Sequence, residues 1–124
     1  MVDERITDGR RIAELLASEL EGREDGGLDS IAVTDADRDV EPSADGSRAY
    51  DVIDDGERIA QVFVHDERAR LEFEAGQDVA AETAADAGLR VRPKAVRPPR
   101  TLVFVESGTE VKRATDVVQS VSRS

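Results

Sequence analysis

The chain has 124 residues, the size of one domain, and carries 28 acidic against 17 basic residues, for a formal net charge of −11. It has no cysteine, which excludes disulfides, thiolate metal sites and cysteine nucleophiles. No apolar run approaches the roughly 18 residues that a membrane span needs, and no apolar signal segment follows the charged N-terminus. We therefore expect one cytoplasmic domain over residues 1–124 with no membrane contact.

The first third of the chain predicts a helix, a short strand and a loop. The helix covers 3–22 and ends at Gly22, with one apolar face formed by Ile12, Leu15, Leu16 and Leu20. Gly9 weakens this helix. A strand over 28–33 follows, and the polar stretch 34–47 predicts an exposed, flexible acidic loop.

Three strands come next, over 50–53, 59–65 and 69–73. Asp54-Asp55-Gly56 predicts a hairpin turn, because Asp-Gly tolerates positive φ angles. The strand over 59–65 is apolar on both faces, which is typical of a central strand that is covered twice. In the strand over 69–73 apolar residues alternate with charged ones, which indicates one face in water.

The last third predicts a helix over 77–87 with Gly88 as its C-cap, an extended tract over 89–100 and a buried strand over 101–105. Three prolines exclude 89–100 from the centre of a sheet, so this tract is an edge strand or a loop. A capping box formed by Ser107 and Glu110 begins the closing helix, whose inward face carries Val111, Ala114, Val118 and Val121.

These elements predict an α+β fold in two layers, with three helices against a mostly antiparallel sheet of about five strands, in the order α-β-β-β-β-α-β-α. The last strand is reached through a helix, so we expect it to lie parallel to a neighbour after a right-handed crossover.

Charge is distributed unevenly along the chain. Residues 1–88 contain nine basic and 25 acidic side chains, a net charge of −16, whereas 89–124 contain eight basic and three acidic side chains, a net charge of +5. Five cations fall within eleven residues without an intervening acid: Arg90, Arg92, Lys94, Arg97 and Arg100. This basic tract is our candidate binding site, because arginine binds carboxylates and phosphates bidentately.

Three interpretations of the basic tract stay open. Its charges pair with the acidic body of the same subunit, or they dock on the acidic face of a second subunit or another protein, or they bind nucleic acid. Against nucleic acid, no aromatic side chain interleaves with the arginines to stack on bases, and the acidic remainder of the chain repels phosphate.

Other candidate sites lack the residues that their chemistry needs. Asp35, Asp37 and Asp39 alternate as in a calcium loop, but Val40 and Gly46 stand where such a loop needs its turn glycine and closing glutamate. His65 precedes Asp66 at the end of a strand, where neighbouring side chains point to opposite faces. There is no phosphate-binding glycine loop and no nucleophile elbow. We assign no catalytic residue, metal ligand or cofactor, and expect a protein that is not an enzyme.

The opening DERITDGRRIAELLASELEG and the ending VESGTEVKRATDVV, together with 15 Arg against two Lys, resemble small acidic proteins of salt-loving archaea that form a domain of unknown function. This resemblance covers nearly the whole chain, carries no chemical motif and implies a cytoplasm rich in salt. A carboxylate-rich surface suits such a solvent, because concentrated salt screens its self-repulsion.

The sequence therefore predicts a non-enzymatic, protein-binding α+β domain adapted to high salt that forms a homodimer. Two features favour the dimer: the strand over 59–65 needs cover on both faces, and the two oppositely charged parts of the chain suit reciprocal pairing. Binding of nucleic acid through the basic tract, 90–100, is the alternative.

Overall fold

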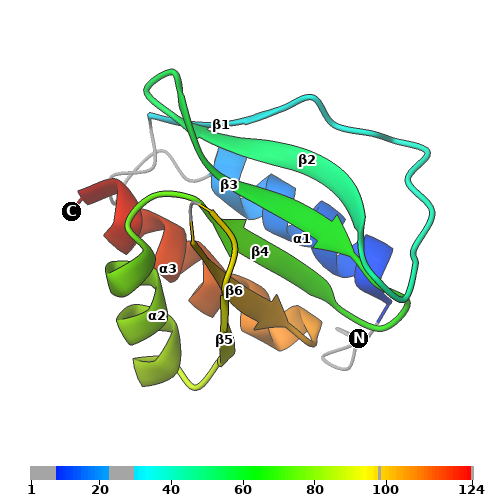
Figure 1. Cartoon of the computed structure of the whole chain (residues 1–124). Helices are drawn as coiled ribbons and strands as arrows, with labels where there is room; N and C mark the ends of the chain where they lie inside the picture. The colour runs from blue at the N-terminus through cyan, green and yellow to red at the C-terminus, as the bar shows by residue number, and fades with distance from the viewer. Residues whose placement is uncertain (1–7, 23–29, 98, 124) are drawn as a thin grey trace.

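The structure is a computed structural model that describes residues 8–22, 30–97 and 99–123. It confirms the α+β fold, with three helices packed on one face of a six-stranded sheet (Figure 1). The elements in chain order are α1 (Gly9–Gly22), β1 (Ile31–Thr34), β2 (Ser47–Asp54), β3 (Glu57–Val64), β4 (Ala69–Phe73), α2 (Gln77–Asp86), β5 (Arg90–Lys94), β6 (Arg100–Val105), a 3₁₀ turn η1 (Gly108–Glu110) and α3 (Val111–Arg123).

The sheet has the strand order β1-β2-β3-β4-β6-β5, and every neighbouring pair is antiparallel. The expectation of a parallel last strand is wrong, because β5 intervenes between α2 and β6 and forms a hairpin that reverses the chain. The first half of the basic tract is the additional, sixth strand. It contains Pro93, which an edge strand tolerates because one side of it needs no partner.

Helix α1 begins at Gly9, after Asp8, whose Oδ1 accepts hydrogen bonds from the backbone N–H groups of Arg10 at 3.0 Å and Arg11 at 3.4 Å. The part of the predicted helix over 3–7 lies outside the described residues. A Cβ atom on Gly9 would clash with the backbone carbonyl oxygens of His65 and Arg68. Gly9 thus lets the helix start against the turn between β3 and β4.

One hydrophobic core lies between the helices and the sheet, built mostly from valine, alanine and leucine. Alternate residues of the inner strands face the helices and are fully buried, among them Val62, Leu71 and Val103, which lie side by side in the strand register. Tyr50 joins the layers, because its hydroxyl donates a 2.7 Å hydrogen bond to the carbonyl oxygen of Ala13 in α1.

Strand β3 is the inner strand that the sequence predicts, and the hairpin turn before it is confirmed by positive φ angles at Asp55 and Gly56. Its second face is covered within the chain. A register shift between β2 and β3 leaves Ile59 in the hydrophobic core, so Phe63 is the apolar side chain of the second face. Its half-buried ring lies under the guanidinium of Arg70, whose Cζ is 4.5 Å from the ring centroid. The apolar second face of β3 therefore no longer requires a partner.

The start of the closing helix differs from the prediction. The side chain of Ser107 makes no capping bond to the helix, and Oε1 of Glu110 accepts from the backbone N–H of Glu106 at 2.8 Å. The 3₁₀ turn η1 precedes α3, and in it the backbone N–H of Glu110 donates to the carbonyl oxygen of Ser107 at 3.1 Å instead of to the Ser107 hydroxyl. The inward face of α3 is as predicted, with Thr115 and Val117 buried as well.

The acidic loop between β1 and β2 is fastened to the body at several points. Val40 is buried in the core, Asp37 N–H donates to the Ala49 carbonyl at 2.7 Å, and Ser43 N–H donates to the Val64 carbonyl at 3.4 Å. The carboxylates of Asp35, Asp37, Asp39 and Glu41 belong to exposed residues. The flexibility expected of this loop stays a prediction.

Candidate functional site

The face of the sheet opposite the helices is charged, and its cations gather on β4, β6 and β5. Within the strand register, Arg90 lies opposite Phe104, and Phe104 lies opposite Arg70. Four residues farther along the same strand pair, Lys94 lies opposite Arg100. We call this surface the cationic face, formed by Arg68, Arg70, Arg90, Arg92, Lys94 and Arg100. Two carboxylates, Glu72 and Glu106, accompany these six cations.

Glu72 is the centre of the cationic face and has no exposed surface. Its carboxylate is 2.6 Å from Nη2 of Arg70, 3.0 Å from Nη1 of Arg100 and 3.4 Å from Nζ of Lys94. Burial would raise the pKa of this carboxyl, but the Arg100 hydrogen bond and the charges of Arg70 and Lys94 outweigh it and lower the pKa below its usual value. The three cations together stabilise the buried negative charge of the Glu72 carboxylate.

Two aromatic rings lie beneath arginines on the same face. Cζ of Arg68 is 4.8 Å from the ring centroid of Phe104, and Cζ of Arg70 is 4.5 Å from that of Phe63. The basic tract itself contains no aromatic side chain, as the sequence shows, but strand pairing places Phe104 beside Arg90 in the sheet. Phe104 is nevertheless buried, so the guanidinium group, and not the ring, meets the solvent.

The five residues of the basic tract divide into two groups. Lys94 and Arg100 bind Glu72, and Nη1 of Arg90 is 3.3 Å from the carboxylate of Glu106. These three pair with the body of their own chain, as one interpretation of the sequence has it.

Arg92 and Arg97 are the second group. Both are exposed and have no hydrogen bond or ion pair with the part of the chain that the structure describes. Between them, in the turn that joins β5 to β6, Val96 is 40% exposed, and no other large apolar side chain in the described ranges is as open to solvent. Two unengaged guanidinium groups and one apolar side chain thus project at the end of the cationic face.

His65 borders this surface and is held at both ring nitrogens. Nε2 lies 3.0 Å from Nη1 of Arg70, and Nδ1 lies 3.0 Å from the carbonyl oxygen of Ala44. Burial, together with the charges of Arg70 and Arg68, lowers the pKa of the imidazole. A neutral histidine whose two nitrogens are both engaged serves to position the loop and has no free lone pair for proton transfer.

Within residues 8–22, 30–97 and 99–123, no three histidine or acidic side chains converge in a way that would hold a metal ion. Asp37, one of the three alternating aspartates, uses Oδ1 to accept from the backbone N–H of Asp39 at 3.0 Å. No helix of the described chain is long and apolar enough to cross a membrane.

The model of one family matches the chain over residues 1–124. The chain belongs to DUF7993, a family of unknown function. No curated protein and no solved structure matches it. The family match covers the whole chain, and no activity is assigned to DUF7993.

Arg68, Arg70 and Glu72 are the site residues of the DUF7993 chain that sequence reasoning missed. The alternation in 69–73 identified a charged face of that strand, but its neighbour in the sheet was not known. Pairing of β4 with β6 places this face beside the basic tract. The available signal was the isolated pair of cations at 68 and 70 in a strongly acidic half-chain.

Proposed function

We propose that this DUF7993 protein is a non-enzymatic protein-binding domain that forms a homodimer through its cationic face. The observation that supports the proposal is the gathering of six cations on one face of the sheet in a chain of net charge −11. Arg92 on this face and Arg97 in the adjoining β5–β6 turn are exposed and have no hydrogen bond or ion pair with the described chain. Charge of one sign concentrated on a surface of the opposite overall sign is the basis of electrostatic complementarity between proteins.

The acidic loop of a second copy is the occupant that complements this face. Its exposed carboxylates alternate along the chain at Asp35, Asp37, Asp39 and Glu41. The same loop borders the cationic face of its own chain, where Nη1 of Arg70 donates to the carbonyl oxygen of Asp45 at 3.0 Å. Adjacent basic and acidic patches suit a two-fold dimer, because each patch then meets its complement on the partner.

Concentrated salt restricts which contacts stabilise such a dimer. At about 1 M salt the Debye length is about 3 Å, so separated charges hardly attract each other. Direct guanidinium–carboxylate pairs at hydrogen-bond distance are screened less, and burial of Val96 adds an apolar contribution that salt strengthens. We propose that the protein works in such a medium, in the cytoplasm of a halophilic archaeon, as its acidic, lysine-poor composition suggests.

Light scattering after size-exclusion chromatography in about 2 M KCl tests the dimer. The expected mass of the native protein is twice the 13.5 kDa of the chain. The variant Arg92→Ser/Arg97→Ser removes two cations that have no partner within the described chain, so we expect it to fold normally and run as a monomer. Lys112→Ser/Arg113→Ser removes the same charge from exposed positions of α3, in the helix layer, and is expected to leave the dimer intact.

A charge exchange extends the test to the occupant. The variant Arg92→Glu/Arg97→Glu is expected to be monomeric, and addition of Asp39→Arg and Glu41→Arg in the same chain restores the dimer. A native protein that stays a monomer at high concentration, or a dimer that is indifferent to Arg92 and Arg97, contradicts the proposal.

Nucleic-acid binding is the second candidate, and one observation favours it. The guanidinium of Arg68 lies over Phe104 on the sheet face and its side chain is 36% exposed, and exposed guanidinium groups can stack on bases. Retention of single-stranded RNA by the native protein in high salt, lost in Arg92→Ser/Arg97→Ser while the mass stays that of a monomer, would establish this candidate in place of the dimer.

A further inference from the structure

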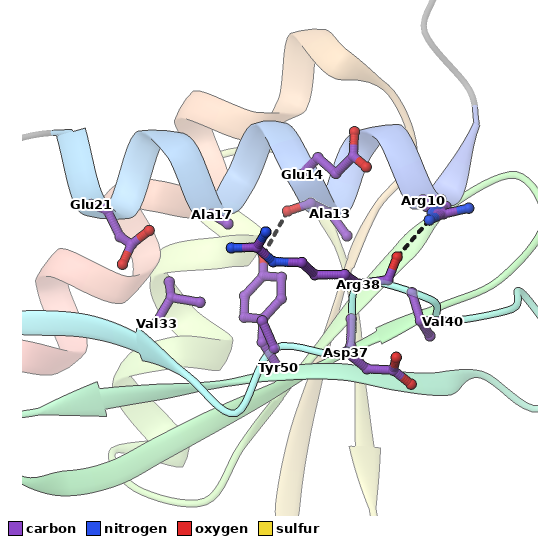
Figure 2. Close-up of a pocket in the computed structure, with 12 residues that line it drawn as sticks. Arg10, Ala13, Glu14, Ala17, Glu21, Val33, Asp37, Arg38, Val40 and Tyr50 are labelled. Atoms are coloured by element: carbon purple, nitrogen blue, oxygen red, sulfur yellow. Dashed lines mark hydrogen bonds between the residues drawn. The ribbon is translucent and has the colours of Figure 1, made fainter.

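A second surface feature, outside the cationic face, is a pocket of about 360 Å³ between α1 and the β1–β2 edge of the sheet (Figure 2). This volume falls within the range of small-molecule pockets, about 300–1,000 Å³. Its walls are apolar and come from the helix, the two strands and the acidic loop: Ala13, Ala17, Val33, Ala36, Val40, Ala49 and Tyr50. Four of these seven residues are alanines, so the hollow persists because the side chains around it are short.

Tyr50 fixes the depth of the pocket. Its ring rises from β2 toward α1, and its hydroxyl is held by the 2.7 Å hydrogen bond to the Ala13 carbonyl (Figure 2). Burial, followed by the negative charge of Glu21, raises the pKa of this hydroxyl, which therefore remains a protonated donor. The innermost part of the pocket is thus apolar, and the Tyr50 hydroxyl there already has its hydrogen-bond partner.

The charged residues at the rim are largely engaged elsewhere. Glu14 pairs with Arg11 at 3.3 Å, Asp37 accepts from the backbone of Asp39, and Nη2 of Arg10 donates to the carbonyl oxygen of Arg38 at 2.6 Å. This last bond attaches the acidic loop to the start of α1 beside the pocket.

The side chain of Arg38 is the exception. It lines the pocket (Figure 2), and its guanidinium makes no hydrogen bond or ion pair with the described chain. An unengaged guanidinium beside an apolar hollow is suited to a ligand with one anionic end and one apolar end.

We propose that this pocket binds a small organic carboxylate, with the apolar body against the alanines and Tyr50 and the carboxylate on the guanidinium of Arg38. None of its lining residues belongs to the cationic face, but Asp37 and Arg38 lie in the acidic loop that forms the other half of the proposed dimer contact. Three rim carboxylates, Glu14, Glu21 and Asp37, would instead favour an amine, and Glu21 lies toward the other end of α1 from Arg10.

The protein carries its own reporter for this site. Tyr50 is the single tyrosine and there is no tryptophan, so the intrinsic fluorescence of the chain arises at the pocket. We would titrate the native protein in about 2 M KCl with hexanoate, hexylamine and hexanol, which share one apolar body and differ in charge. A saturable fluorescence change with hexanoate, at least about tenfold weaker with the other two, is expected from one charge-assisted hydrogen bond.

Three variants locate the binding. Arg38→Gln, at an exposed position, is expected to weaken hexanoate binding about tenfold, and Ala17→Leu, which fills the pocket, to abolish it. Arg11→Gln removes an exposed cation of α1 that does not line the pocket and is expected to change nothing. Absence of a saturable signal, preference for hexylamine, or full binding by Arg38→Gln overturns the proposal. Folding of each variant is checked by circular dichroism in the same salt.

Discussion

Nη1 of Arg70 lies 3.0 Å from Nε2 of His65 and fixes the state of that imidazole. Arginine has donors only, so Nε2 accepts, and the ring proton resides on Nδ1, which donates to the carbonyl oxygen of Ala44. A proton on Nε2 would face the Arg70 charge. One arginine thus sets the tautomer of His65 while it also holds Glu72 at 2.6 Å.

We expect His65 to titrate below its ordinary pKa of about 6.5 and to carry its proton on Nδ1 when neutral. It is the single histidine, so a two-dimensional ¹H–¹⁵N spectrum recorded against pH reads both properties directly. Because the folded pKa is the lower one, the unfolded chain binds more protons, and this contribution to stability is lost as pH falls below about 6.5. A pKa at or above that value, or an Nε2-protonated ring, contradicts this assignment.

Replacement of Glu72 by Gln is expected to lower the free energy of unfolding by about 3 kcal/mol, because Arg70, Lys94 and Arg100 then face one another without a carboxylate. Denaturant unfolding in constant salt measures the change. Glu82→Gln, at an exposed position of α2, removes the same charge and is expected to stay within about 0.5 kcal/mol of the native protein.

The Glu72 carboxyl also predicts a pH dependence. Its pKa is lowered on folding, so its contribution is complete above the unfolded pKa of about 4.3 and is lost as pH falls through the folded value. The Glu72→Gln variant is expected to lose less stability than the native protein between pH about 5 and about 3. Parallel stability curves for the two proteins over that interval would show that the carboxyl is not stabilised by its three cations.

Replacement of Gly9 by Ala is expected to destabilise the protein by about 1–3 kcal/mol or more, because the new Cβ meets the backbone carbonyls of His65 and Arg68, which cannot rotate away. Gly22→Ala at the other end of α1 meets nothing within 4 Å and is the matched control. Thermal unfolding followed by circular dichroism compares the two. A Gly9 variant as stable as the Gly22 variant would mean that α1 does not start against this turn.

Dialysis from about 2 M KCl into tens of millimolar is expected to unfold the chain, since 28 carboxyl side chains repel one another once the screening length grows. Loss of the far-ultraviolet circular dichroism signal is the measurement. A spectrum unchanged in dilute buffer contradicts adaptation to high salt. Potassium chloride and sodium chloride at equal ionic strength are compared to separate screening from binding of a particular cation.

Local patterns in the sequence predicted most of the fold. The apolar spacing at Ile12, Leu16 and Leu20 placed α1, and the Asp55-Gly56 turn placed the β2–β3 hairpin. The predictions that failed concern pairing between strands that are distant in the sequence. The parallel strand was inferred from a helix that precedes it, and nothing local shows that Arg90–Lys94 pairs with Arg100–Val105 before the chain joins β4.

Only part of the candidate site was predicted, namely the basic tract; Arg68, Arg70 and Glu72 were not. The basic tract can be recognised in the sequence as a run of cations. Glu72, the carboxylate that Lys94 and Arg100 bind, lies in β4, and α2 separates β4 from the basic tract in the sequence. Burial of a carboxylate cannot be recognised from its own neighbours, because a strand of alternating charge usually faces water. The pocket beside Tyr50 had no sequence signal either, since alanines on a helix face are ordinarily packed against a partner.

Pro93 has a consequence for assembly. It interrupts the row of backbone donors along the outer side of β5, and cations flank it at Arg92 and Lys94. A strand from another molecule cannot form a regular ladder of hydrogen bonds with β5. This edge of the sheet therefore does not support growth of copies of the protein into continuous fibrils. Any association on this side of the molecule must proceed through side chains, which leaves its specificity to charge and shape.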